Sequence, residues 1–125
     1  MIENNEQYIS LSTQKTDGSF VRTPVWFARE GIKQNYFVYT AKKSGKVKRI
    51  KNFSHVKVAV CNFRGKINGD WIEAKAYLIE DEILVKLAFS LLRKKYGIKF
   101  FIGDFLSWIV GKYNQRQIIN IQIKN

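Results

Sequence analysis

The chain has 125 residues, of which 46% are hydrophobic and 14% aromatic, a composition that supports a packed core and excludes a disordered chain. Lys and Arg outnumber Asp and Glu by 22 to 10, and the formal charge of +12 attracts nucleic acid, anionic membranes and phosphorylated small molecules alike. The single cysteine, Cys61, excludes an intramolecular disulfide and a cysteine-cluster metal site. The polar N-terminus is unlike a signal peptide, and the longest apolar stretch, residues 100–110, is too short to span a bilayer. We therefore expect a soluble, cytoplasmic protein with no membrane partner, in which residues 1–125 form one domain.

Short alternating apolar runs separated by turns predict six β-strands. The first two, at residues 8–13 and 20–29, flank a turn at Asp17-Gly18 and are expected to pair as a hairpin. The other four are predicted at residues 36–40, 56–61, 71–79 and 117–124. Pro24 donates no ladder hydrogen bond, which predicts an edge position or a bulge in the second strand. Six short strands with few helices favour a small barrel, mainly β, over a doubly wound sheet.

The apolar spacing predicts two helices, at residues 46–53 and 81–96, and a third, looser helix at residues 99–110. The segment from about 81 to 110 is therefore a helical excursion between the last two strands. Gly97 is placed to end the second helix. An apolar stripe at helical spacing runs along that helix and predicts that it covers an open part of the barrel. The stripe consists of Ile83, Leu84, Leu87, Ala88, Leu91 and Leu92.

The most informative local feature is the segment 40–49, where a strand ends, a glycine-containing turn follows and a helix begins. Helix starts present unpaired amides and partial positive charge to anions. Ser44 suits the N-cap position, and its hydroxyl can also donate to a phosphate oxygen. Lys46 and Arg49 are three residues apart and so share one helical face. The pattern predicts an anion site, although a solvated run of basic residues accounts for the composition equally well.

Other candidate residues carry weaker signals. His55 is the only histidine, with no second ligand at metal spacing, and is interpreted as an exposed strand-end residue. Cys61 lies in an apolar alternation and is interpreted as an inert buried thiol. The amides of the residues that follow Pro24 are candidates for facing a ligand. Aromatic residues that can line a flat ring, or simply fill a core, are Trp26, Phe27, Tyr36, Tyr39 and Trp71.

The order of these motifs resembles the pyridoxamine 5'-phosphate oxidase-like superfamily of FMN-binding split barrels. The similarity is greatest to its group of small coenzyme F420-dependent enzymes and extends from about residue 8 to 123. It rests on the segments 23–27, 44–50, 58–61 with 64–65, 69–76 and 92–97. The resemblance implies a six-stranded antiparallel split β-barrel that forms a homodimer with two cofactor sites at the subunit interface.

The resemblance also implies roles for individual residues. Ser44 and Lys46, with Arg49 behind them, match the phosphate-binding turn, and Thr40 and Ala41 match the strand end beside the ribityl chain. The strand whose backbone lines the isoalloxazine corresponds to Val25, Trp26 and Phe27, and the strand that approaches the other subunit's cofactor corresponds to Trp71 and its neighbours. The chain lacks the arginine-rich C-terminal segment of true pyridoxamine phosphate oxidases, so synthesis of pyridoxal phosphate is not expected.

The resemblance implies that FMN or coenzyme F420 is the cofactor and that hydride passes to a small unsaturated or nitro-type substrate. No dedicated catalytic acid or base is needed for the hydride step, and none is found in the sequence. Two alternatives belong to other classes. One is a flavin- or haem-binding module without turnover, and the other, which we favour least, is a nucleic-acid-binding barrel suggested by the charge and the aromatic residues.

Overall fold

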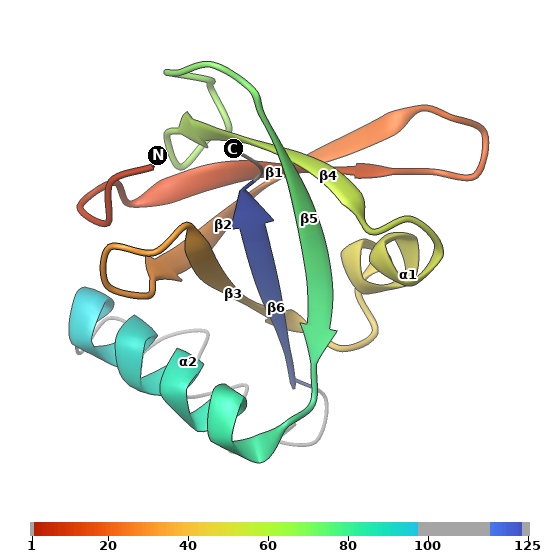
Figure 1. Ribbon diagram of the computed structural model, residues 1–125. Coiled ribbons are helices and arrows are strands. Elements are labelled where there is room, and N and C mark those ends of the chain that lie inside the picture. Colours follow the sequence, from red (N-terminus) through yellow and green to blue (C-terminus); the bar gives the residue numbers. More distant parts are fainter. Residues whose placement is uncertain (1, 98–115, 124–125) are drawn as a thin grey trace.

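The computed structural model describes residues 2–97 and 116–123. These residues form six strands and two helices (Figure 1). The elements, in chain order, are β1 Tyr8–Gln14, β2 Phe20–Arg29, β3 Asn35–Ala41, α1 Gly45–Asn52, β4 His55–Cys61, β5 Ile72–Ile79, α2 Glu82–Tyr96 and β6 Arg116–Ile123. Every predicted boundary that falls on these residues is confirmed to within one residue, while the predicted helix at 99–110 lies outside the described residues.

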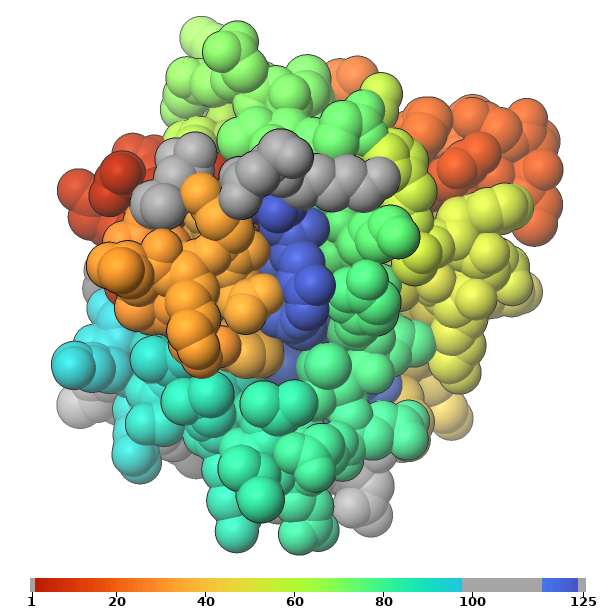
Figure 2. Space-filling view, viewed as in Figure 1, coloured from red at the N-terminus to blue at the C-terminus, as the bar shows by residue number. Residues whose placement is uncertain are grey.

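The strands form a closed barrel in the order β1-β2-β3-β6-β5-β4, and every neighbouring pair is antiparallel. The predicted fold class, a mainly β six-stranded antiparallel barrel, is thus confirmed. The C-terminal strand β6 lies between β3 and β5, although it is last in the sequence, and it reaches the surface as a narrow strip between them (Figure 2). None of the helices in the described ranges has the length and apolar character needed to cross a membrane.

The predicted edge position of Pro24 is confirmed by the pairing of β2. This strand pairs with β1 from Phe20 to Trp26, and Pro24 lies opposite Ser10 in that ladder. Its pairing with β3 covers only residues 27–29. Pro24 therefore lies where β2 has a strand partner on one side, so its missing N–H breaks no ladder.

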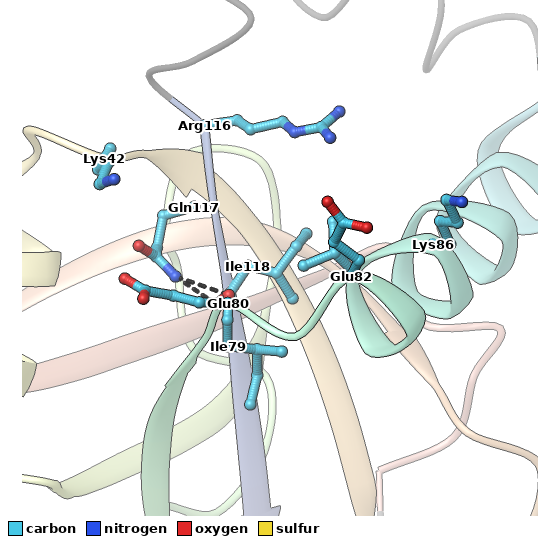
Figure 3. A pocket seen from close by; sticks show the side chains of 9 residues that line it. Lys42, Ile79, Glu80, Glu82, Lys86, Arg116, Gln117 and Ile118 are labelled. Atoms are coloured by element: carbon cyan, nitrogen blue, oxygen red, sulfur yellow. Dashed lines mark hydrogen bonds between the residues drawn. The ribbon is translucent and has the colours of Figure 1, made fainter.

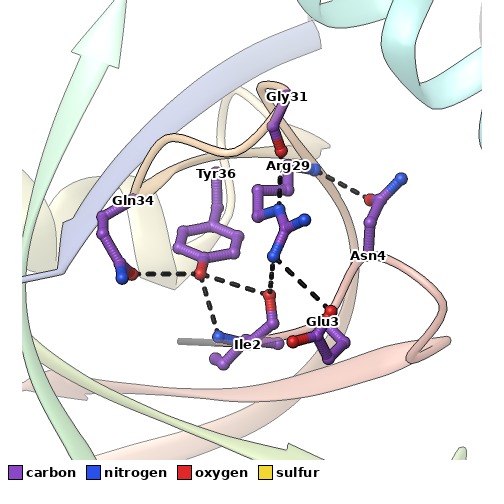
Figure 4. Close-up of polar contacts among 7 residues, drawn as sticks. All are labelled: Ile2, Glu3, Asn4, Arg29, Gly31, Gln34 and Tyr36. Carbon is purple, nitrogen blue, oxygen red and sulfur yellow. Dashed lines mark hydrogen bonds and ion pairs between the residues drawn. The ribbon is translucent and has the colours of Figure 1, made fainter.

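The barrel interior is filled by alternate residues of all six strands. Its core includes Leu11, Phe27 and Tyr36, none more than 1% exposed. The segment before β1 adds Ile2 to this core (Figure 4). The Tyr36 hydroxyl accepts from the Ile2 amide at 3.0 Å, while Arg29 Nη1 donates to the Ile2 carbonyl at 3.3 Å and the Arg29 amide donates to the Asn4 side chain at 2.9 Å. Hydrogen bonds thus fasten the N-terminal segment to β2 and β3.

The expected position of the second helix needs a correction. Because the barrel is closed, α2 does not fill an opening but packs on the outer surface of the barrel, where Ala88 and Leu92 meet Ala28 and Phe37. Only the later part of the predicted stripe is covered. Ile83 is 77% exposed and Leu84 37% exposed, because the part of α2 that packs on the barrel begins after them, at Val85.

Candidate functional site

Helix α1 begins without a side-chain cap. Ser44 is its N-cap residue in an extended conformation, but its side chain makes no capping hydrogen bond. The Ser44 hydroxyl instead lies 3.5 Å from Thr40 Oγ1, which donates to it. The first turn also carries no acidic residue. The unpaired amides of a helix start carry partial positive charge and need acceptors from outside the helix.

Two basic side chains add to this positive charge. Lys46 is half-buried, and Arg49 packs across the helix start, with Nη1 2.6 Å from the place that a Cβ on Gly45 would occupy. Arg49 also donates from Nε to the hydroxyl of Thr13, on β1, over 2.6 Å. Burial, and secondly the positive charge of Arg49, lower the pKa of Lys46 below its ordinary value. Lys46 is therefore a cation held in a place that disfavours its charge.

Neither cation has an acidic partner in the part of the chain that the structure describes. The ion pairs there involve Arg29, Lys33, His55 and Lys57 instead. Positive charges held together at the positive end of a helix repel one another. A bound anion would offset that repulsion, and a phosphate suits the donors present, since lysine offers a point charge and arginine a planar fork.

Five of the residues predicted for the site lie together at this turn. Thr40 and Ala41 end β3, the Ser44 amide donates to the Ala41 carbonyl at 3.0 Å, and Lys46 and Arg49 follow on α1. This proximity follows from local chain geometry, as expected from the spacing. That the group holds a cofactor stays a prediction.

The three predicted residues of β2 have separate environments. Val25 and Phe27 point into the barrel core, at 7% and 0% exposure, whereas the Trp26 ring stacks on Tyr96 of α2, with centroids 4.5 Å apart and planes at 12°. The Phe27 amide donates to the Tyr96 hydroxyl at 3.0 Å, so it does not face a ligand as the sequence suggested. Because alternate residues of a strand direct their main-chain groups to the same side, those of Val25 also point toward β1.

Trp71 lies apart from the α1 turn. It precedes β5, and the guanidinium of Arg22 lies over its ring, 4.8 Å from the centroid. No hydrogen bond or ring contact among the described residues joins Trp71 to Ser44, Lys46 or Arg49. Within one chain the predicted site residues therefore fall into three groups. Five lie at the α1 turn, three lie on β2, and Trp71 stands alone before β5.

Several solved structures have a similar fold at low sequence identity. A candidate pyridoxamine 5'-phosphate oxidase from Listeria innocua is 18% identical, with 95% of this chain and 85% of that chain covered and a TM-score of 0.66. An F420 reductase is also 18% identical, with 98% and 90% covered and a TM-score of 0.63. The haem storage protein HutZ from Vibrio cholerae is 15% identical, with 96% and 83% covered and a TM-score of 0.72. The chain has the pyridoxamine 5'-phosphate oxidase-like split-barrel fold.

That fold is reached without close sequence similarity. No protein-family model matches the sequence, and no curated protein matches it significantly. The resemblance inferred from the motif order is thus confirmed at the level of the split barrel. Any assignment of a cofactor or an activity must therefore be argued from the chain's own residues.

A polar cavity of about 620 Å³ lies between the end of β5, the start of β6 and the start of α2, and Lys42 of the turn before α1 borders it (Figure 3). Its wall includes Glu80, Glu82, Lys86 and Arg116, and Gln117 donates to the carbonyls of Ile79 and Ile118 at 3.1 and 3.0 Å. None of the predicted site residues lines it. Acidic and basic side chains share its wall, so it lacks the one-signed charge that distinguishes the α1 turn.

Sequence reasoning missed the contributions of Thr13 and of Tyr96 with Lys95. Thr13 is fully buried and accepts from Arg49 across 36 positions. The one signal for it was a polar residue at a position of β1 that alternation with Ile9 and Leu11 assigns to the inside. Tyr96 and Lys95 both reach the Phe27 main chain, and no local pattern in the sequence indicates that contact.

Proposed function

We propose that this chain binds FMN or coenzyme F420 with the cofactor phosphate at the start of α1, and acts as an oxidoreductase on a small acceptor. The observation that carries the proposal is the pair of half-buried cations, Lys46 and Arg49, at an uncapped helix start with no acidic residue in its first turn. Each feature alone is common on protein surfaces. Together they describe a site whose charge is unbalanced until an anion binds.

The residues of the α1 turn fit a phosphate. Ser44 would donate its hydroxyl, Lys46 its ammonium and Arg49 its guanidinium, while Thr40 and Ala41 would border the chain that joins phosphate to ring. We assign the ring to β2 beside Trp26, whose main-chain groups point away from β1 because those of Val25 and Phe27 point toward it. We assign Trp71 to the cofactor of a second subunit, so a homodimer is part of the proposal.

When bound, the cofactor supplies a ring that accepts and donates hydride. The chain's own part is to hold the phosphate, orient the ring and exclude water. The +12 charge favours a ring system that becomes anionic on reduction, because the field of the protein stabilises negative charge. No side chain need transfer a proton for hydride to move, and none is assigned that task.

An absorption titration tests the proposal. Purified protein is titrated with FMN and, separately, with coenzyme F420, and the visible band is followed for a saturable change. The proposal predicts saturation with at least one of them, together with a rise in melting temperature that grows with cofactor concentration. No spectral or thermal change with either compound would count against it.

The likeness to a haem storage protein favours haem as the second candidate. The only histidine, His55, has Nε2 2.6 Å from the Glu73 carboxylate, so that nitrogen already has a partner. Titration of the protein with haem distinguishes a haem-binding protein from a flavin-binding one. A sharp, stoichiometric Soret band that is lost in His55→Ala would favour haem, whereas a weak, unsaturable band with preserved flavin binding would favour the flavin site.

A further inference from the structure

One hydrogen bond and one close approach, to residues of two different elements, define where the Arg49 guanidinium lies. Its Nε donates to Thr13 Oγ1 at 2.6 Å, and its Cζ, Nη1 and Nη2 lie 3.4, 2.6 and 3.6 Å from the position of a Cβ on Gly45. No hydrogen bond within the described residues uses either terminal nitrogen. A planar fork with two spare donors thus lies across the start of α1.

Thr13 is suited to hold Arg49 in this orientation. It is fully buried near the end of β1, where it pairs with Val21 of β2 on one side and with Val56 of β4 on the other. Its hydroxyl donates to the Val21 carbonyl at 3.5 Å and accepts from Arg49. A threonine hydroxyl has one hydrogen to donate, so donation to the β2 backbone leaves an oxygen lone pair for the arginine.

Gly45 contributes by the absence of a side chain rather than by an unusual backbone. The glycines with positive φ in the described residues are Gly18, Gly31, Gly65 and Gly97. Gly45 is not among them, so its backbone would accept another residue. A Cβ there would meet Nη1 at 2.6 Å, closer than atoms pack, and the flexible end of Arg49 would have to move away.

We propose that Thr13 and Gly45 are positioning residues of the anion site, which place the Arg49 guanidinium so that both terminal nitrogens face one bound phosphate. The inference rests on the proposed function for its ligand. It deepens that function by assigning phosphate recognition to a contact between β1 and α1 rather than to the α1 turn alone. Bidentate donation gives direction as well as strength, so loss of this placement weakens phosphate binding while leaving the fold intact.

A double-mutant cycle on FMN affinity, or on coenzyme F420 affinity if only that cofactor binds, tests the proposal. Thr13→Val removes the hydroxyl at constant shape, and we expect a roughly three- to tenfold rise in Kd. Thr13→Ser keeps the hydroxyl and should bind like wild type, as should Thr16→Val, the same change at an exposed threonine of the hairpin. In an Arg49→Ala background, Thr13→Val should have no further effect. An equal loss in both backgrounds, or no loss in either, would overturn the assignment.

Gly45→Ala supplies a second route to the same displacement. It should weaken cofactor binding with an unchanged or slightly raised melting temperature, because alanine favours helix over glycine. A matched loss of affinity and of thermal stability would instead indicate a structural role.

A ligand-free measurement separates this inference from the proposed function. Phenylglyoxal modifies exposed arginines, and peptide mass mapping gives the rate at Arg49. We expect that rate to increase severalfold in Thr13→Val and in Gly45→Ala, and to stay near the wild-type rate in Thr13→Ser. If wild-type protein binds neither cofactor but these rates change as expected, the proposed function fails and the placement of Arg49 stands. If the rates do not change, the placement itself is rejected.

Discussion

The amine of Lys95 lies over the ring of Phe27, 3.4 Å from its centroid, and donates to the main-chain oxygen of the same residue at 2.8 Å. The neighbouring Tyr96 hydroxyl binds the Phe27 amide and carbonyl and the carbonyl of Gln7. The β1–β2 ladder stops at the pair Tyr8 and Trp26. Beyond it, the last turn of α2 bridges the main chains of the next two residues, Gln7 and Phe27. The strand that we assign to the cofactor ring is held from outside by this helix end.

The first prediction concerns the pH dependence of folding. Burial lowers the pKa of Lys95 to about 7, and Glu6 opposes that shift only in part. A lysine whose pKa is lower in the folded state binds fewer protons there than in the unfolded state, so the free energy of unfolding should rise with pH between about 7 and 9.5. The amine is partly exposed, and we expect a rise of only about 1–2 kcal/mol after screening.

Denaturant unfolding at several pH values measures this rise, and Lys95→Met is the control. The variant keeps the side-chain length without the charge, so the difference between the two curves isolates Lys95 from Lys46, whose pKa is lowered as well. Parallel curves for wild type and Lys95→Met would show that Lys95 keeps its proton in the folded state throughout this range.

The second prediction concerns Tyr96. Its hydroxyl satisfies the Phe27 amide, which no strand partner reaches on that side, so Tyr96→Phe should lower the free energy of unfolding by about 1–3 kcal/mol. Tyr77→Phe is the matched control, because Tyr77 is 40% exposed and no hydrogen bond of its hydroxyl is found among the described residues. Urea denaturation of both variants gives the comparison. Similar small losses in the two would mean that water replaces Tyr96 at the Phe27 amide.

Most of the fold was predictable because its signals are local. Alternation at Val56, Val58 and Val60 defines one strand, and Pro24 marks the part of β2 that has a single strand partner. Such patterns depend only on the two-residue period of a strand and on turn chemistry. They do not specify where α2 packs, because the same apolar stripe would suit an open barrel or the outside of a closed one.

The candidate site likewise has a part that local sequence predicts and a part that depends on contacts between distant residues. Ser44, Lys46 and Arg49 were predictable as a group, since helix geometry brings residues three apart to one face. The contact that orients Arg49 joins it to Thr13, 36 positions earlier, and the contact that holds β2 to the end of α2 joins Phe27 and Lys95, 68 positions apart. Nothing in a single sequence specifies such pairs, because they depend on barrel register and on the packing of α2.

The third prediction tests the phosphate role of Lys46. Lys46→Ala should raise the Kd for FMN or coenzyme F420 through a loss of about 1.5–3 kcal/mol, the contribution of a charge-assisted hydrogen bond, or roughly ten- to hundredfold. Lys48→Ala is the control, since it removes the same charge from an exposed position of the same helix. Equal effects of both substitutions would mean that general charge attraction, rather than a site at Lys46, governs binding. Raised salt should reduce the effect of Lys48→Ala more than that of Lys46→Ala, because exposed charges are screened first.

The fourth prediction tests the corrected position of α2. Leu92 is fully buried among Ala28, Phe37 and Ile118, so Leu92→Ala should cost about 2–5 kcal/mol of unfolding free energy through lost apolar contact and the cavity it leaves. Ile83→Ala, on the same predicted stripe but 77% exposed, should cost less than about 0.5 kcal/mol. Chemical denaturation of dilute protein measures both. A large cost at Ile83 that appears only at high protein concentration would place the first turn of α2 in a contact between subunits, whereas a large cost at every concentration would mean that the helix lies against its own barrel along its whole length.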